Sequence, residues 1–160
     1  MTNPHLESTL VLIKPDAVQR GLIGTILARL EAKGLFVLGL RSFVFSDELV
    51  REHYADLADR PFFPDLAAFM TSGMTVAVWV SGVDVVAVTR AMIGATNARD
   101  AAPGTVRGDL AASTQRNLIH ASDSPESARA ELARFFPDGP TVAENQAAVR
   151  AIYATAETGS

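Results

Sequence analysis

The sequence predicts an α+β fold of the split βαβ type, in which helices cover a four-stranded sheet. Three observations lead to this prediction. Four short apolar or β-branched runs, typical of buried strands, alternate with segments of helical periodicity. The 160 residues, 48% of them apolar, suffice for one ordinary core, and no repeat or linker divides them. The lack of cysteine excludes disulfides, cysteine-ligated metals and thiol catalysis.

The first elements are a strand, a helix and a second strand. Residues 9–13 form a short apolar run that a Lys-Pro-Asp turn ends, as expected of a central strand. Apolar residues then recur at helical spacing over 23–30, and Gly34 is typical of the position just past a helix. Apolar, β-branched and aromatic residues predict the second strand over 36–45.

The middle of the chain contains two helical segments and the strongest strand. Ser46 precedes two acidic residues and resembles an N-cap, which predicts a helix through about Tyr54. A proline-rich break at 59–64 precedes a short helical segment that ends near Gly73. The β-branched run 74–80 follows it and predicts the third strand.

The last part of the chain contains a long irregular stretch between regular elements. A helix is predicted over 85–93, and the stretch 95–117 is long enough to suggest a functional loop. A short strand at 117–120 follows. Ser124, with proline and glutamate after it, predicts the start of another helix, and 143–154 is weakly helical.

The overall charge is mildly acidic, with a formal value of −4. Proteins that bind nucleic acid usually carry a basic face, so this charge argues against nucleic acid as the primary partner. No apolar run reaches the ~18 residues of a membrane span, and the first eight residues lack a signal-peptide pattern. We therefore expect a cytoplasmic protein without a membrane partner. We also expect a single domain over 1–160, with disordered tails at 1–8 and about 155–160.

His120 is the strongest candidate for a catalytic residue. It ends the last predicted strand, with polar neighbours at Asn117, Ser122 and Asp123. The helix start at Ser124 puts free backbone N–H groups nearby, which favours an anion. A neutral imidazole, with an ordinary pKa near ~6.5, is a competent nucleophile at neutral pH. A histidine at a strand end is, by itself, equally often part of a core or its rim.

The other histidines have weaker support. His5 lies near the N-terminus and His53 precedes Tyr54 in a predicted helix, so we expect both to be structural or solvated. Glu131 lies two helical turns into the helix after His120. Its carboxylate could lean back toward the ring, and on spacing alone it could equally be an exposed helix carboxylate.

Basic residues in and beside the long irregular stretch could bind phosphate. Arg90, Arg107 and Arg116 lie among glycines that allow close backbone approach, although each could also be solvated. Lys14, one of only two lysines, ends the first strand. The chain has no P-loop, dinucleotide-binding glycine motif, zinc-protease helix or hydrolase elbow, so these common scaffolds are not supported.

Several long motifs in one order resemble the nucleoside diphosphate kinase family. The resemblance runs colinearly from about Ser8 to Phe136, and it is far more specific than any single short pattern. The motifs are KPDAVQRG at 14–21, RPFF at 60–63, PGTVRGD at 103–109 and RNLIHASDS at 116–124.

The resemblance implies a ferredoxin-like βαββαβ sandwich with a four-stranded antiparallel sheet. It also implies a ping-pong reaction in which His120 takes the γ-phosphate of a nucleoside triphosphate, with ATP as donor, and passes it to a nucleoside diphosphate. Mg²⁺ would be carried by the nucleotide phosphates, with Asp123 as an outer-shell partner. A homo-oligomer, hexameric or tetrameric, is a further implication of the resemblance.

The resemblance also assigns roles around the nucleophile. Lys14 and Asn117 are similar to the family's contacts to the ribose hydroxyls, and Lys14 would also lie near the transferred phosphate. Tyr54 is similar to the hydroxyl beside the histidine. Ser122 and Glu131 resemble the pair that orients the ring, with the glutamate fixing its tautomer.

The nucleotide itself would be held by a second set of residues. Arg90, Thr96 and Arg107 resemble the clamp on the β- and γ-phosphates. Phe62 resembles the ring on which the base stacks, with Leu66 helping to form the slot. Because an aromatic face accepts any base, this arrangement implies broad base tolerance.

The chain departs from the usual family pattern at a few positions. Ala121 follows the nucleophile where the family has glycine, and would be excluded only if the backbone needed a positive φ. Ala95 and Ala98 replace a common glutamate and proline, and Thr114 and Gln115 replace a branched apolar residue and glycine. We expect these changes to affect assembly and loop stability before catalysis.

Two alternatives remain at this point. The chain could be a non-catalytic nucleotide-binding relative, although His120 is retained together with Lys14, Arg90, Arg107 and Glu131. It could also be a nucleic-acid-binding regulatory relative, which the acidic charge makes at best a secondary role.

Overall fold

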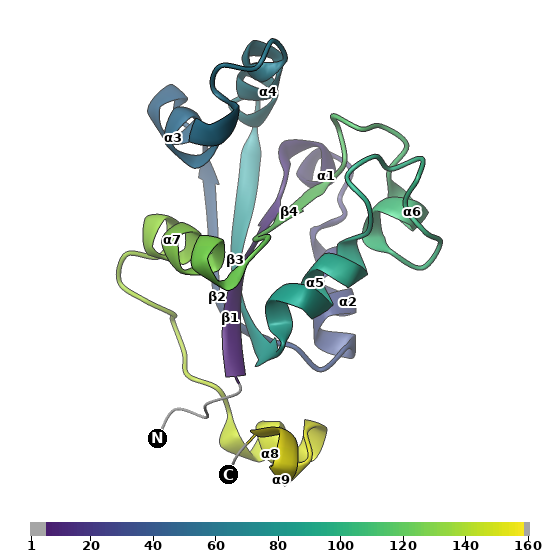
Figure 1. Ribbon diagram of the computed structural model, residues 1–160, viewed down its shortest axis with the longest axis vertical. Helices are drawn as coiled ribbons and strands as arrows, with labels where there is room; N and C mark the ends of the chain where they lie inside the picture. The colour runs from purple at the N-terminus through teal and green to yellow at the C-terminus, as the bar shows by residue number, and fades with distance from the viewer. Residues whose placement is uncertain (1–5, 159–160) are drawn as a thin grey trace.

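The computed structural model describes residues 6–158, in which four strands form one sheet in the order β2-β3-β1-β4 (Figure 1). Every neighbouring pair is antiparallel. The strands are β1 (Leu6–Ile13), β2 (Phe36–Val44), β3 (Met74–Val83) and β4 (Ile119–Ala121). The predicted α+β fold with a four-stranded antiparallel, ferredoxin-like sheet is confirmed.

The longer helices lie where the sequence predicts them, but the turn expected after residue 13 is a short helix, Pro15–Gln19, and the stretch expected to be irregular contains another, Val106–Leu110. Ser46 and Ser124 both cap helices as predicted, because their hydroxyl oxygens accept hydrogen bonds from the N–H groups of Leu49 and Ser127. Among the described residues, no helix is long and apolar enough to cross a membrane. The helical elements are α1 (Pro15–Gln19), α2 (Ile23–Ala32), α3 (Asp47–His53), the 3₁₀ turn η1 (Ala55–Leu57), α4 (Phe63–Met70), α5 (Val85–Ile93), α6 (Val106–Leu110), α7 (Pro125–Phe135), α8 (Gln146–Ile152) and α9 (Thr155–Thr158).

The expected disordered tails are wrong within the described residues. Leu6 and Ser8 pair with β3, and the Trp79 indole donates a hydrogen bond to the Ser8 hydroxyl, so this segment is strand. Near the other end, α9 forms where a tail was expected. Residues 1–5 and 159–160 lie outside the described residues, and so does the expectation about His5.

Helices cover both faces of the sheet, which explains why β1 is apolar without alternation. Leu10 and Leu12 point into a core formed with α3, α4 and α7. Val11 and Ile13 point into the opposite core, formed mainly with α2 and α5. In the antiparallel pairing of β1 with β4, His120 lies opposite Leu12. Directly opposed residues share a face, so the His120 side chain points toward α7 and α3.

Candidate active site

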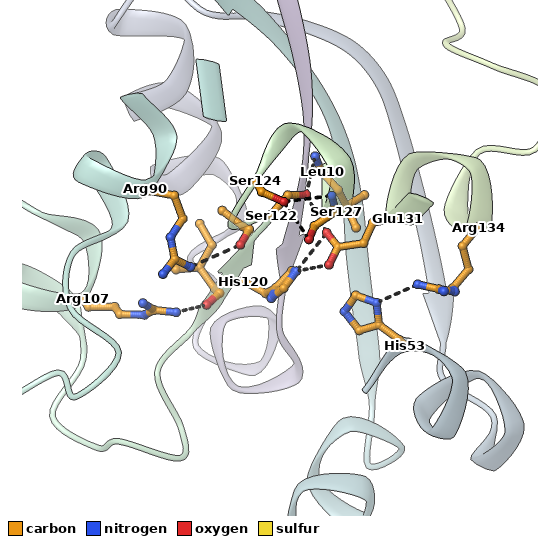
Figure 2. Close-up of polar contacts among 12 residues, drawn as sticks. Leu10, His53, Arg90, Arg107, His120, Ser122, Ser124, Ser127, Glu131 and Arg134 are labelled. Carbon is orange, nitrogen blue, oxygen red and sulfur yellow. Dashed lines mark hydrogen bonds and ion pairs between the residues drawn. The ribbon is translucent and has the colours of Figure 1, made fainter. Parts of the chain in front are cut away.

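His120 and Glu131 form the centre of the site (Figure 2). The ring Nε2 of His120 lies 3.2 Å from both carboxylate oxygens of Glu131. An ionised carboxylate only accepts hydrogen bonds, so Nε2 carries the hydrogen and Nδ1 keeps its lone pair. The contact therefore selects the tautomer in which Nδ1 has a free lone pair.

Ser122 holds the Glu131 carboxylate that orients the His120 ring. Its hydroxyl donates to Glu131 Oε2 at 2.5 Å and accepts from the backbone N–H of Leu10 at 3.3 Å. Burial alone would raise the pKa of Glu131, but hydrogen bonds and charge from His120 and the hydrogen bond from Ser122 hold that pKa below its usual value. Glu131 thus stays ionised, as an acceptor for the histidine must.

Lys14 and Asn117 meet at the ends of β1 and β4. Lys14 Nζ donates to Asn117 Oδ1 at 2.8 Å, and the Asn117 amide donates to the Thr96 carbonyl at 2.9 Å. Burial, and secondarily the charge of Arg107, lowers the pKa of Lys14 to about 8, while the charge of Asp16 opposes them. These contacts bring the long irregular stretch against the strand that carries the histidine.

Two arginines flank the backbone around the histidine. Arg107, only 4% exposed, donates to the main-chain carbonyls of Asn117, Gly94 and Ile119 at 3.3, 2.9 and 2.6 Å. Arg90 donates to the carbonyl of Ala121 at 3.3 Å. Burial, and then the charge of Arg90, lowers the pKa of Arg107 to about 10. Both guanidinium groups keep N–H donors for a further acceptor.

The site concentrates positive charge without paired carboxylates. Among residues 6–158, Lys14, Arg90 and Arg107 form no ion pair. Lys14 and Arg107 are buried, whereas Arg90 is exposed. Burying a cation without a counter-charge is unfavourable, so this arrangement is suited to an anionic ligand that supplies the missing charge. Multiply charged phosphates match guanidinium groups well.

A strained turn precedes the histidine. Leu118, fully buried, has a φ of 72°, and the N–H of Ile119 donates to the Asn117 carbonyl at 2.9 Å, which makes a tight γ-turn. The Asp16 carboxylate accepts from the N–H of Leu118 at 3.1 Å. The turn reverses the chain between Asn117 and His120, so both side chains can serve one site.

The Tyr54 side chain, at the end of α3, lies beside the histidine. The rings of Tyr54 and His120 lie 6.5 Å apart, and the Tyr54 hydroxyl is buried without a hydrogen-bond partner within the described chain. Burial, reinforced by the charge of Glu131, raises the pKa of this hydroxyl. It therefore remains a protonated donor beside the ring.

Sequence reasoning missed two residues at the site. His53, expected to be structural or solvated, packs edge-on against His120 with ring centroids 5.0 Å apart. Arg134 lies beside it, its guanidinium 3.5 Å from His53 Nδ1. The only local signal was the sequence neighbour Tyr54, because the contact depends on how α3 and α7 pack on one face of the sheet.

The residues assigned to a base slot lie on α4. Phe62, at the N-terminus of α4, is 46% exposed, so a face of its ring is accessible. Leu66 is 9% exposed and packs in the core, which leaves little more than its edge for a ligand. Nearby, Gln115 and Arg116 face α4 across a hollow of about 340 Å³.

One group of described side chains lies close enough together to hold a metal ion. A ring nitrogen of His53, one of His120 and an oxygen of Glu131 all lie within 4.8 Å of one another. Mg²⁺ prefers oxygen ligands, and the positive charge of Arg134 beside His53 opposes any cation. These residues do not fit a resident Mg²⁺.

The departures from the family pattern are accommodated. Among the described residues other than glycine, positive φ occurs only at Asp84 and Leu118, so Ala121 adopts an ordinary strand conformation. Ala98 is buried at 4% exposure. Thr114 donates to the Asn97 side chain at 2.8 Å, a contact that an apolar residue could not make.

Comparisons with known proteins agree with this geometry. A family model described as nucleoside diphosphate kinase matches residues 7–141. A nucleoside diphosphate kinase of Methanosarcina barkeri is 53% identical over 133 residues, covering 83% of this chain and 89% of that protein. One of Nocardia farcinica is 53% identical over 135 residues, covering 84% and 97%. The structure of a halophilic nucleoside diphosphate kinase from Halobacterium salinarum in complex with CDP superposes with a TM-score of 0.90 at 45% identity, covering 94% and 100% of the two chains.

Proposed function

The chain belongs to the nucleoside diphosphate kinase family of phosphotransferases, and we propose that it moves a γ-phosphate between nucleotides through a phosphohistidine on His120. The observation that carries this mechanism is the His120 ring held by Glu131 with Nδ1 unprotonated, beside three cations without carboxylate partners. Such a site offers both a nucleophile and charge neutralisation for a phosphoryl group.

The reaction runs in two halves. In the first, His120 Nδ1 attacks the γ-phosphorus of a nucleoside triphosphate such as ATP, the N–P bond forms, and the bond to the β-phosphate oxygen breaks to release the diphosphate. In the second, a β-phosphate oxygen of another nucleoside diphosphate attacks, and the electron pair of the N–P bond returns to Nδ1. Glu131 holds the Nε2 hydrogen throughout.

Charge neutralisation falls to the basic residues. Arg90 and Arg107, with Thr96 beside them, would clamp the β- and γ-phosphates, and Lys14 would reach the transferred group. Mg²⁺ would enter bound to the nucleotide phosphates as part of the substrate. The exposed Asp123 carboxylate would contact that ion only through water.

The remaining site residues would hold the rest of the nucleotide and the ring. Lys14 and Asn117 would bind the ribose hydroxyls, and the buried Tyr54 hydroxyl would donate near Nδ1. Phe62 would stack on the base, with the edge of Leu66 beside it. Stacking reads no base edge, so this slot would accept purines and pyrimidines alike.

A phosphoenzyme assay tests the mechanism. Incubation with Mg²⁺ and radiolabelled ATP, without acceptor, would give an acid-labile, base-stable label on the wild type and on an Arg129→Ala control. His120→Ala would carry none, and label that persists in this variant would refute the assigned nucleophile. Purine and pyrimidine diphosphates would all discharge the label within roughly tenfold of one another. Strict selectivity for one base would refute stacking on Phe62.

The organisation of the protein is part of the same proposal. We place one nucleoside diphosphate kinase domain over 1–160, in the cytoplasm, which cell fractionation would test. We also propose a homo-oligomer, hexameric or tetrameric. The edge strand β2, whose Leu40 and Val44 are 52% and 59% exposed, supports self-association. Light scattering that found a monomer would refute it.

A further inference from the structure

His53 lies against the proposed nucleophile, yet the mechanism above gives it no part. Its ring packs edge-on to His120, with an interplanar angle of 80°. Three further rings surround it: Tyr54 at 4.5 Å, Phe135 at 5.1 Å and Phe45 at 6.0 Å between centroids. Rings on several sides leave the imidazole little freedom to turn, so its two nitrogens have defined directions.

Arg134 determines which nitrogen of His53 carries the hydrogen. An Arg134 guanidinium nitrogen lies 3.5 Å from His53 Nδ1, and a guanidinium only donates hydrogen bonds. Nδ1 is therefore the acceptor and Nε2 carries the hydrogen. Arg134 is itself held by the Glu52 carboxylate at 2.8 Å, which keeps the donor in place.

The Nε2–H of His53 is a buried donor without a hydrogen-bond partner within the described chain. In Figure 2 the ring nitrogen that does not face Arg134 is turned toward the pair formed by His120 and Glu131. Nitrogen and oxygen atoms of these three side chains lie within 4.8 Å of one another. A buried unpaired donor is costly, and its persistence beside reacting groups calls for a functional explanation.

We propose that His53 is a positioning residue for phosphoryl transfer, its Nε2–H supporting the Glu131 carboxylate so that His120 keeps the tautomer with a free Nδ1. A donor near a carboxylate favours its ionised form, and an ionised Glu131 accepts the hydrogen of His120 Nε2. Arg134 acts one step further out, by fixing the tautomer of His53. The proposal rests on the phosphohistidine mechanism above.

Burial and the surrounding charges keep the His53 ring neutral. Burial, followed by the charge of His120, lowers the pKa of His53 to about 3; Arg134 and Lys14 lower it further and Glu131 opposes them. These groups come from β4, from α7 and from the end of β1, whereas Phe45 and Tyr54, which also pack against the ring, carry no charge near neutral pH. Near neutral pH the ring is thus a donor at Nε2 and carries no charge that would compete with His120.

Four variants separate this role from simple packing. His53→Phe keeps an aromatic ring without the donor, and His53→Gln restores an amide N–H near the Nε2 position. Arg134→Met removes the group that sets the tautomer. Arg129→Met removes the same charge from the exposed side of the same helix and serves as the control.

Steady-state kinetics across pH give the first readout. For His53→Phe we expect kcat to fall about tenfold with little change in KM, and the acidic limb of the kcat profile to move to higher pH because Glu131 protonates more easily. His53→Gln would recover most of both, Arg134→Met would show a smaller change in the same direction, and Arg129→Met would match wild type. A fall in kcat without movement of the acidic limb, or no recovery in His53→Gln, would overturn the proposal.

A direct measurement of tautomer does not depend on the reaction. Two-bond ¹⁵N–¹H spectra of the wild-type protein, with the histidines assigned through His53→Gln and His120→Ala, would show His53 neutral and protonated at Nε2 from pH 6 to pH 8. A titrating His53, or a hydrogen at Nδ1, would overturn the proposal whatever the phosphoenzyme assay shows. Label on His120→Ala would instead refute the proposed function and leave the tautomer result intact.

Discussion

The strained turn before the histidine is maintained by one carboxylate, and Asp16→Ala tests this. Leu118 is fully buried in a left-handed conformation that costs roughly 1–3 kcal/mol in a residue other than glycine. Its N–H donates to Asp16, which is itself only 8% exposed. Removing the carboxylate leaves a buried donor unpaired, at a cost of about 1–3 kcal/mol. We expect a loss of roughly 2–3 kcal/mol in the free energy of unfolding.

Urea unfolding and thermal melting would measure this loss. At about 2–4 °C per kcal/mol for a chain of this size, Tm would fall by roughly 4–12 °C. Asp16→Asn keeps an oxygen acceptor and would lose about half as much. Phosphoenzyme formation would slow in parallel, because the turn sets the direction of His120.

A matched control separates the turn from the general effect of losing a carboxylate. On the surface, Asp109 pairs with Arg29 at 2.8 Å and also accepts from the N–H of Gly104 at 2.8 Å. An exposed ion pair contributes at most about 1 kcal/mol, and an exposed N–H can bond to water when the carboxylate is removed. If Asp16→Ala cost no more than Asp109→Ala, the carboxylate would not be holding Leu118, and the account of the turn would be wrong.

Three further predictions concern the glycine and the cations of the site. Gly94→Ala would lower the free energy of unfolding in urea by about 3 kcal/mol, because the φ of Gly94 is +84° and a Cβ there would lie 2.4 Å from Thr105 Oγ1. Gly21→Ala, where φ is +69° and the space is open, would lower it by about 1 kcal/mol. Equal losses would contradict this. Because folding lowers the pKa of Lys14 to about 8, the unfolded chain binds more protons above that pH, so this residue makes stability rise between pH 8 and pH 10. Lys14→Met would flatten that part of the stability profile, and an unchanged slope would refute the assignment. Arg107→Lys would lose about 2 kcal/mol in a thermal melt and raise the KM for nucleotide, since the three carbonyls are bonded by three separate nitrogens of a planar group that a single ammonium nitrogen does not reproduce. Wild-type values for both would contradict the role of Arg107 in the clamp.

Local patterns predicted most of the fold. The N-caps at Ser46 and Ser124 and the helix over 23–32 depend on interactions within one turn of chain, so a single segment of sequence contains the whole signal. The short helix α6 was missed inside the irregular stretch 95–117, although Thr105 caps it by accepting from the N–H of Gly108. A loop sequence rich in glycine and arginine is compatible with either a turn or a short helix. The tertiary contacts of Arg107 favour the helix.

The candidate site was only partly visible in the sequence. Motifs identified His120, Lys14 and Arg107 because each lies inside a long run resembling one family. Glu131 could equally have been a surface carboxylate, and what brings it to the histidine is the pairing of His120 with Leu12, which turns the ring toward α7. Whether alanine is tolerated at position 121 also depends on the tertiary structure, because pairing in β4 gives Ala121 the negative φ of an ordinary strand.

By itself, the sequence predicted the order of the strands and of the longer helices, the family, and His120 as the candidate nucleophile, because short-range periodicity and colinear motifs carry that information. Only the tertiary structure decided the tautomer of His120, the strained conformation of Leu118 and the presence of His53 and Arg134 beside the reacting ring. The contact of His53 with Arg134 joins residues 81 positions apart, and that of Asp16 with Leu118 joins residues 102 apart, through sheet register and helix packing. A chain's local pattern contains no record of which side chains that packing will bring into contact.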